Sequence, residues 1–129
     1  MTRDAGIRVA VPSKGRLRDE TLDLLSTAGY RVSGLRGRGS TVRASGLELI
    51  EMRPRDAATA LAAGTLDGAF IATDISMEHG TSHLRTQPLG AARSTLVIAA
   101  READGPSTLA ELDGGVVATH MPALTQRFL

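Results

Sequence analysis

The 129-residue sequence contains no cysteine, only three aromatic side chains and a single lysine. Without cysteine the chain has no disulfide, no thiolate metal ligand and no thiol nucleophile. Its core must be aliphatic, and the rings of Tyr30, Phe70 and Phe128 are too widely spaced along the chain to form a platform for stacking nucleic-acid bases. We therefore expect no nucleic-acid partner.

Long hydrophobic runs are also missing. No stretch reaches the roughly 18 apolar residues that a membrane-spanning helix needs. The opening MTRDAGIRVA lacks the apolar centre of a signal peptide. With 42% hydrophobic residues the chain can bury a core, and its length allows one domain or two small lobes. We expect a soluble, cytoplasmic protein with no membrane partner.

The net charge of +1 hides an asymmetry between the two halves of the chain. Residues 1–55 contain 11 Lys/Arg and 6 Asp/Glu, whereas residues 56–129 contain 4 and 8. A basic N-terminal half is suited to an anionic ligand. The alternative is that these cations are simply solvated surface side chains of a protein rich in arginine, alanine and glycine.

Strand and helix patterns alternate along the first two thirds of the chain. Helical spacing predicts one helix from Leu17 to Ala28, with Ser13 at its start and Gly29 after its end. A second helix begins at Pro54 and ends before Gly64. Buried strands are expected at 7–11, 47–52 and 67–73, and an irregular segment or ragged hairpin at 30–46.

The last third of the sequence predicts further strands. Residues 84–90 and 94–101 have the composition of neighbouring strands, and 116–119 that of another. A short helix capped by Ser107 or Thr108 lies between them, and a final helix begins at Pro122. Strands that alternate with helices indicate an α/β fold with a mainly parallel sheet.

Polar groups follow three of the predicted strands. They are Ser13, Lys14, Gly15 and Arg16 after the first, Arg53, Arg55 and Asp56 after the second, and Thr73 and Asp74 after the third. In open α/β sheets ligands bind outside the carboxyl ends of the strands, and helix N-termini favour phosphate. The pattern is typical of a phosphate-binding site, with solvated loop cations as the alternative. Asp74 either hydrogen-bonds a ligand or caps the short helix that follows.

The histidines carry little further signal. His79 and His83 have a spacing of four, but Gly80 interrupts any helix that would align them, so no metal site is predicted. Thr119 and His120 follow a predicted strand and are candidates to line the same cleft as the phosphate loop. No Ser–His–Asp arrangement is present, and we assign no catalytic side chain.

Four segments, taken in order, resemble the N-terminal part of ATP phosphoribosyltransferase. The resemblance covers nearly the whole chain and is most specific at the strand–SKGR–helix junction and at the RPRD helix that precedes LDG and Asp74. The segments are VAVPSKGRL, LLSTAGYRVSG, LELIEMRPRDAATALAAGTLDGAFIATD and LAELDGGVVATHMPALTQRFL.

The resemblance implies transfer of a phosphoribosyl group from phosphoribosyl pyrophosphate to N1 of ATP, with Mg²⁺, in the first step of histidine biosynthesis. It also implies a two-lobed fold similar to type II periplasmic binding proteins. Residues 1–90 would form the first lobe and residues 91–129 an incomplete second lobe. Both substrates are polyanions, whose charge Lys14, Arg16 and Arg53 would offset.

The sequence departs from the family in two respects. Ala69–Asp74 replaces the family's glycine–threonine–glycine pattern before the aspartate. The family's phosphoribosyl pyrophosphate loop lies beyond Leu129, so we expect no product from this chain alone and self-association or a partner subunit through residues 94–129. The alternatives are a non-catalytic nucleotide-binding or regulatory relative that completes a partner chain, and an α/β binding module with no nucleotide role.

Overall fold

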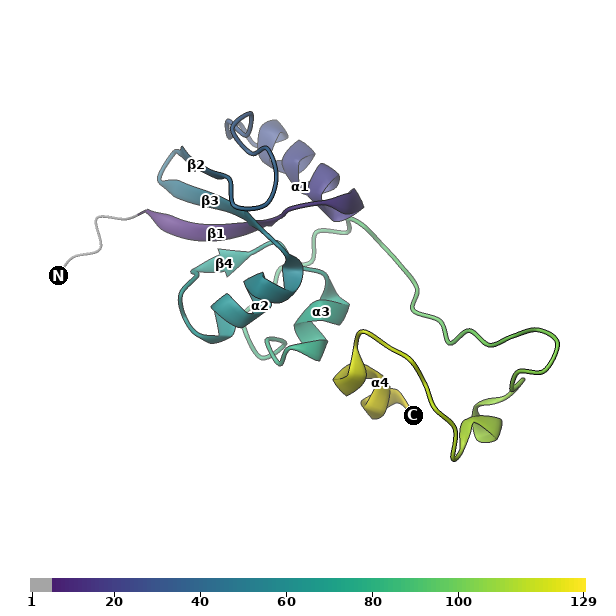
Figure 1. Cartoon of the computed structure of the whole chain (residues 1–129). Helices are drawn as coiled ribbons and strands as arrows, with labels where there is room; N and C mark the ends of the chain where they lie inside the picture. The colour runs from purple at the N-terminus through teal and green to yellow at the C-terminus, as the bar shows by residue number, and fades with distance from the viewer. Residues whose placement is uncertain (1–5) are drawn as a thin grey trace. The chain divides into compact units, whose positions relative to one another are not determined.

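The computed structural model describes residues 6–129, which divide into two compact units. The first unit extends to Ala92 and the second comprises Arg93–Leu129. The first contains all the strands of the described chain, and the second contains only short helical turns and extended segments (Figure 1).

A four-stranded sheet forms the centre of the first unit. Its strands are β1 (Ile7–Pro12), β2 (Thr41–Ala44), β3 (Leu47–Met52) and β4 (Gly68–Ala69), in the order β2-β3-β1-β4. The central strand β1 is parallel to both β3 and β4, while β2 is antiparallel to β3. The sheet is therefore mixed, and the predicted α/β class is confirmed.

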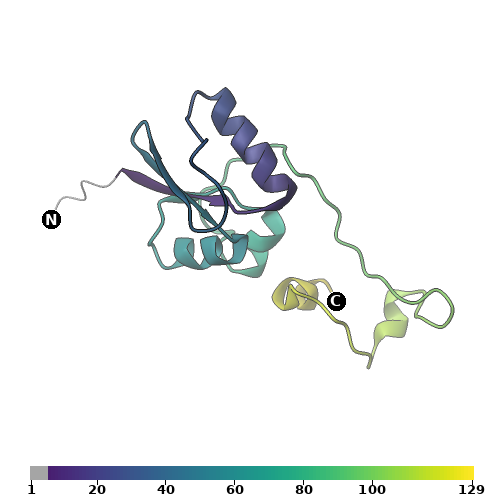
Figure 2. The same cartoon turned by 45° about the horizontal axis from the view of Figure 1, so that its top comes forward.

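Helices cover both faces of this sheet. Helix α1 (Gly15–Thr27) lies on one face, while α2 (Pro54–Ala62) and α3 (Thr73–Glu78) lie on the other (Figures 1 and 2). One core cluster joins Val11, Leu25, Leu35 and Leu49, and a second joins Ala10, Ala57 and Leu66.

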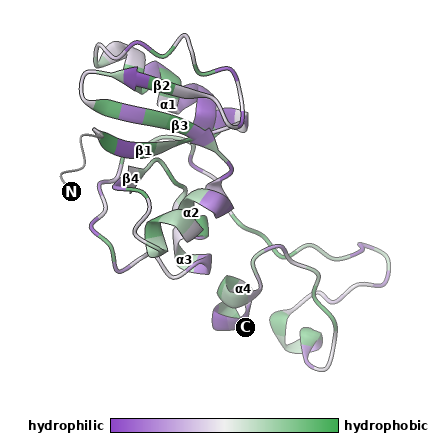
Figure 3. Ribbon diagram, turned by 60° about the vertical axis from the view of Figure 1, so that its left-hand side comes forward, coloured by the Kyte–Doolittle hydropathy of each residue, from purple (hydrophilic) through white to green (hydrophobic). Residues whose placement is uncertain are grey.

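The alternation of side chains along the strands explains the two clusters. Successive residues of a strand point to opposite faces, so Leu49 packs with Leu25 of α1 while its neighbour Ile50 packs on the α2 side. The hydropathy colouring shows green along most of β3 and α2, interrupted on β3 by charged positions (Figure 3). Small alanines on α2 allow that helix to approach the sheet closely.

Several predicted boundaries are confirmed. The strands at 7–11 and 47–52 are present as β1 and β3, and Pro54 opens α2 at a position where its missing N–H is not needed. The segment 30–46 is irregular as far as Ser40 and then forms β2, which pairs with β3 through a turn at Ser45 and Gly46.

Three local predictions in the first unit are wrong. Lys14, rather than Ser13, is the residue at the N-terminal boundary of α1, because the chain stays extended for one more residue before it turns. Asp74 lies inside the first turn of α3, whose boundary residue is Ala72. The predicted strand 67–73 pairs only at Gly68 and Ala69, because the following residues leave the sheet toward α3.

The strands predicted at 84–90, 94–101 and 116–119 are not formed. Residues 94–100 make no backbone hydrogen bond within the described chain, and a strand exists only through such pairing. Apolar side chains of the predicted strands are exposed: Val97 has 79% and Val116 has 98% of its surface accessible to solvent. The short helices are as predicted: η1 (Leu109–Leu112) follows Thr108, and α4 (Pro122–Phe128) begins at Pro122.

None of the helices found between residues 6 and 129 is both long enough and apolar enough to cross a membrane.

We expect Leu49→Ala to lower the free energy of unfolding of the first unit by about 2–5 kcal/mol, because the side chain is fully buried and its removal leaves a cavity. Leu24→Ala is the matched control, since Leu24 lies on α1 with 43% of its surface exposed. Chemical denaturation of both variants measures the difference. Equal losses in the two variants would contradict this position of the core.

Candidate functional site

The three predicted loops meet at one edge of the sheet. Pro12 at the end of β1 lies opposite Met52 at the end of β3, and the N–H of Ser13 donates to the Met52 carbonyl at 3.1 Å. On the other side of β1, the N–H of Phe70 donates to the Ala10 carbonyl at 3.0 Å. The chain therefore leaves β1, β3 and β4 at the same carboxyl edge of the sheet.

We call the polar residues that follow these strands the strand-end cluster. Its members come from the loops after β1, β3 and β4 and were all identified from the sequence. They are Ser13, Lys14, Gly15, Arg16, Arg53, Arg55, Asp56, Thr73 and Asp74.

The loop between β1 and α1 depends on a glycine. Gly15 has a φ of +79°, a backbone conformation that residues with a side chain rarely adopt. A Cβ atom at this position would meet no atom within 4 Å, so open space lies beside the Gly15 backbone. No side chain caps the N-terminus of α1, which leaves its first N–H groups to another acceptor.

The cluster carries exposed positive charge. Lys14, Arg53 and Arg55 are exposed, and no carboxylate of residues 6–129 lies within ion-pair distance of them. Arg16 is also exposed, and its Nε lies 3.5 Å from a carboxylate oxygen of Glu20 one turn further along α1. Cations without a carboxylate partner are available to bind an anionic ligand.

The acidic members of the cluster come from α2, with the exposed Asp56 in its first turn, and from α3. Thr73 is the exposed first residue of this helix, and Asp74 is half-buried beside it. Asp74 Oδ1 accepts the N–H of Ile75 at 2.8 Å, which leaves the second carboxylate oxygen to other partners.

Thr119 and His120 belong to the second unit, directly before α4. The Thr119 hydroxyl accepts the N–H of Met121 at 3.0 Å and lies 3.0 Å from the hydroxyl of Thr125, so it stabilises the start of the helix. His120 is exposed. Their role as cleft residues stays a prediction.

The other two histidines lie around the end of α3. His79 is its C-terminal boundary residue, and His83 Nδ1 lies 2.9 Å from the Gly80 carbonyl oxygen. Between residues 6 and 129, no three His, Asp or Glu side chains come together as a set that could hold a metal ion.

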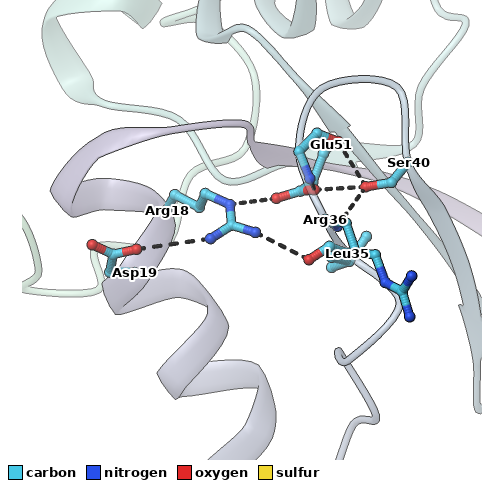
Figure 4. A network of polar contacts seen from close by, with 7 residues as sticks. Arg18, Asp19, Leu35, Arg36, Ser40 and Glu51 are labelled. Carbon is cyan, nitrogen blue, oxygen red and sulfur yellow. Dashed lines mark hydrogen bonds and ion pairs between the residues drawn. The ribbon is translucent and has the colours of Figure 1, made fainter.

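Sequence reasoning missed one charged residue next to the cluster, the fully buried Glu51 of β3. Its carboxylate accepts hydrogen bonds from Arg18 Nε at 2.5 Å, from the Ser40 hydroxyl at 2.6 Å and from the N–H of Gly37 (Figure 4). A glutamate at a position of β3 that faces the core is a signal for a buried charge, but its partners come from α1 and from the loop before β2.

The environment of Glu51 lowers the pKa of its carboxyl group. Burial alone raises this pKa, but the hydrogen bonds from Ser40, Arg18 and Gly37, together with the positive charge of Arg18, more than offset that effect. The ionised form is therefore favoured in the folded protein. Removing a partner would leave a buried charge without compensation.

Because the pKa of Glu51 is lower in the folded than in the unfolded chain, its contribution to stability is present above the ordinary glutamate pKa of about 4.3 and is lost as the pH falls below it. Denaturant titrations from pH 7 to pH 3 measure this loss. Glu51→Gln should be less stable than the parent at pH 7 and should lose less stability on acidification. An unchanged acid sensitivity in Glu51→Gln would contradict the assignment.

Comparison with known proteins identifies relatives over almost the whole chain. A sequence model of the ATP phosphoribosyltransferase family matches residues 53–129. The ATP phosphoribosyltransferase of Salinispora tropica is 35% identical over 124 residues, and that of Gemmatimonas aurantiaca is 37% identical over 130 residues. Each alignment covers 95% of this chain and 44% of the relative, so the chain spans less than half the length of these proteins. The chain belongs to the ATP phosphoribosyltransferase family.

Proposed function

We propose that this chain supplies the nucleotide-binding part of an enzyme that transfers a phosphoribosyl group from phosphoribosyl pyrophosphate to N1 of ATP, the first step of histidine biosynthesis. The observation that carries the proposal is the strand-end cluster, where Lys14, Arg53 and Arg55 present positive charge at one edge of the sheet. Membership of the family indicates which polyanions this edge would bind.

In the proposed reaction, the N1 lone pair of ATP forms a bond to the anomeric carbon of the phosphoribosyl group. The bond from that carbon to pyrophosphate breaks, and pyrophosphate leaves with the electron pair. Both reacting atoms belong to the substrates, so no activated side chain of the protein is required. Catalysis would come from positioning the two substrates and from offsetting the charge of the phosphates.

The strand-end cluster suits this task in two ways. The N-termini of α1 and α2 lack side-chain caps, so backbone N–H groups there are available to phosphate oxygens. The open backbone at Gly15 allows a phosphate to approach closely, and Lys14 and Arg53 follow the ends of the neighbouring strands β1 and β3. Asp74 would accept a hydrogen bond from a substrate hydroxyl or amine.

Magnesium, which the family resemblance implies, neutralises phosphate charge when it binds and thereby favours departure of pyrophosphate. Mg²⁺ is commonly held by one or two carboxylates and by the substrate's own phosphates. The strand-end cluster offers the carboxylates of Asp56 and Asp74 for that mode.

We further propose that the two units correspond to parts of two lobes, with residues 1–90 in the first and residues 91–129 in the second. Thr119 and His120 would then belong to the second lobe. The division of the chain after Ala92 supports this proposal.

We expect Lys14→Ala and Arg53→Ala each to weaken ATP binding by about 1.5–3 kcal/mol, because each removes a charge-assisted contact to phosphate. Isothermal calorimetry measures the affinity. Arg43→Ala is the matched control, since Arg43 is an exposed cation of β2 that lies opposite Glu48, away from the carboxyl edge. Equal ATP affinities in all three variants and the parent would contradict a role of the strand-end cluster in ATP binding.

A second measurement separates binding from catalysis. The chain is mixed with ATP, phosphoribosyl pyrophosphate and Mg²⁺, and phosphoribosyl-ATP is followed by absorbance and mass spectrometry. If the parent chain forms product and Lys14→Ala does not, the result supports phosphoribosyl transfer by this chain. ATP binding without product supports the alternative of a non-catalytic nucleotide-binding relative that completes a partner chain.

We also expect residues 94–129 to mediate self-association, because they expose Val97, Val116 and Phe128 together with unpaired backbone groups. Sedimentation at micromolar concentration should show a species larger than the monomer. Val97→Lys should shift it toward the monomer, while Ser94→Lys, a polar and exposed position in the same segment, should not. A folded, monodisperse parent monomer would contradict this expectation.

A further inference from the structure

A loop rich in glycine and arginine lies beside the strand-end cluster. It comprises Leu35–Ser40, immediately before β2, and carries Arg36 and Arg38. The N–H of Glu51 donates to the Ser40 carbonyl at 2.9 Å, and the N–H of Gly39 donates to the Glu51 carbonyl at 2.8 Å. The loop is thereby held along the carboxyl half of β3, the strand that leads into Arg53.

The side chain of Glu51 also contacts this loop. Its carboxylate accepts the N–H of Gly37 and the hydroxyl of Ser40, and Arg18, which completes the pair, also donates to the Leu35 carbonyl at 3.0 Å (Figure 4). Every residue of this network other than Glu51 and Arg18 belongs to the loop. We call these contacts the Glu51 network.

The conformation of the loop depends on two glycines. Gly37 and Gly39 both have positive φ angles, +128° and +87°, and glycine is the residue with the greatest backbone freedom in an unfolded or loosened segment. The loop also contributes only one fully buried side chain to the core, that of Leu35. The Glu51 network therefore adds side-chain contacts to the backbone hydrogen bonds that hold the segment carrying Arg36 and Arg38.

We propose that Glu51 is a positioning residue, which together with Arg18 holds the loop Leu35–Ser40 at the carboxyl edge of the sheet so that the charge of the loop adjoins the strand-end cluster. The inference rests on the proposed function, because it concerns the same polyanion site. A loop that is already ordered loses less conformational entropy when ATP binds, and the affinity for ATP is correspondingly higher.

The burial of the Arg18–Glu51 ion pair argues against a purely stabilising role. Arg18 and Glu51 are a largely buried ion pair, and such a pair is a poor source of stability because desolvation offsets most of the attraction. Apolar residues of similar volume would fill the same space between α1 and β3. What those residues could not supply is the set of hydrogen bonds to Gly37, Ser40 and the Leu35 carbonyl.

The test replaces the pair by apolar side chains, in the double variant Arg18→Met, Glu51→Leu. It measures the unfolding midpoint, amide hydrogen exchange at Gly37 and Gly39, and ATP affinity by calorimetry. We expect a folded protein with faster exchange at Gly37, whose acceptor is lost, and ATP affinity reduced about tenfold. The matched control is Arg8→Met, Glu48→Leu, which removes an ion pair of 3.3 Å between β1 and β3, and should leave the affinity unchanged.

Ser40→Ala provides an independent variant that keeps the ion pair. It removes the hydroxyl that donates to Glu51 and to the Gly37 carbonyl and accepts the N–H of Arg36. It should weaken ATP binding about threefold, with faster exchange at Gly37. If the double variant does not fold, Ser40→Ala alone decides the question.

The outcomes separate this inference from the proposed function. Faster exchange at Gly37 with unchanged ATP affinity would overturn the positioning role, while the loss of affinity in Lys14→Ala would leave the proposed function intact. A parent chain that binds no ATP would overturn both. Reduced affinity in both the double variant and its control would also overturn the inference, since the effect would then not be specific to the loop.

Discussion

The arrangement of the candidate site depends on the parallel pairing of β1 with β3 and β4. Because parallel strands finish at the same edge of a sheet, three loops that are far apart in the sequence leave the sheet side by side. The register places Pro12 opposite Met52, so the loop with Lys14 and the loop with Arg53 begin at the same level. A shift of one residue in this register would separate the cations and turn the core side chains to the wrong faces.

Glu51 links this geometry to the irregular part of the first unit. It occupies a position on β3 where the alternation of the strand calls for an apolar residue facing α1. The chain instead places a carboxylate there and satisfies it with groups from α1 and from the loop before β2. In this way one buried charge joins the sheet, a helix and a glycine-rich loop, at a distance of two residues from Arg53.

The two units of the chain differ in how their apolar residues are used. In the first, apolar side chains of the strands pack against helices on both faces of the sheet. In the second, the apolar residues Leu96, Val97, Ile98 and Val116 are exposed, and no strand of the described chain pairs with them. The composition of a buried strand is therefore present without the partner strands and covering layers that such a strand requires.

Local patterns in the sequence determined the features that depend on neighbouring residues. Apolar β-branched runs marked β1 and β3, Pro54 marked the start of α2, and the position of Lys14 and Arg53 after strands marked the candidate site. Only the tertiary structure determined which groups donate hydrogen bonds to Glu51, where β4 ends and whether residues 94–101 pair with another strand. Each of these depends on contacts between segments that are distant in sequence. The hydrophobic pattern of a strand indicates that the strand is buried, but it does not identify the segments that cover it.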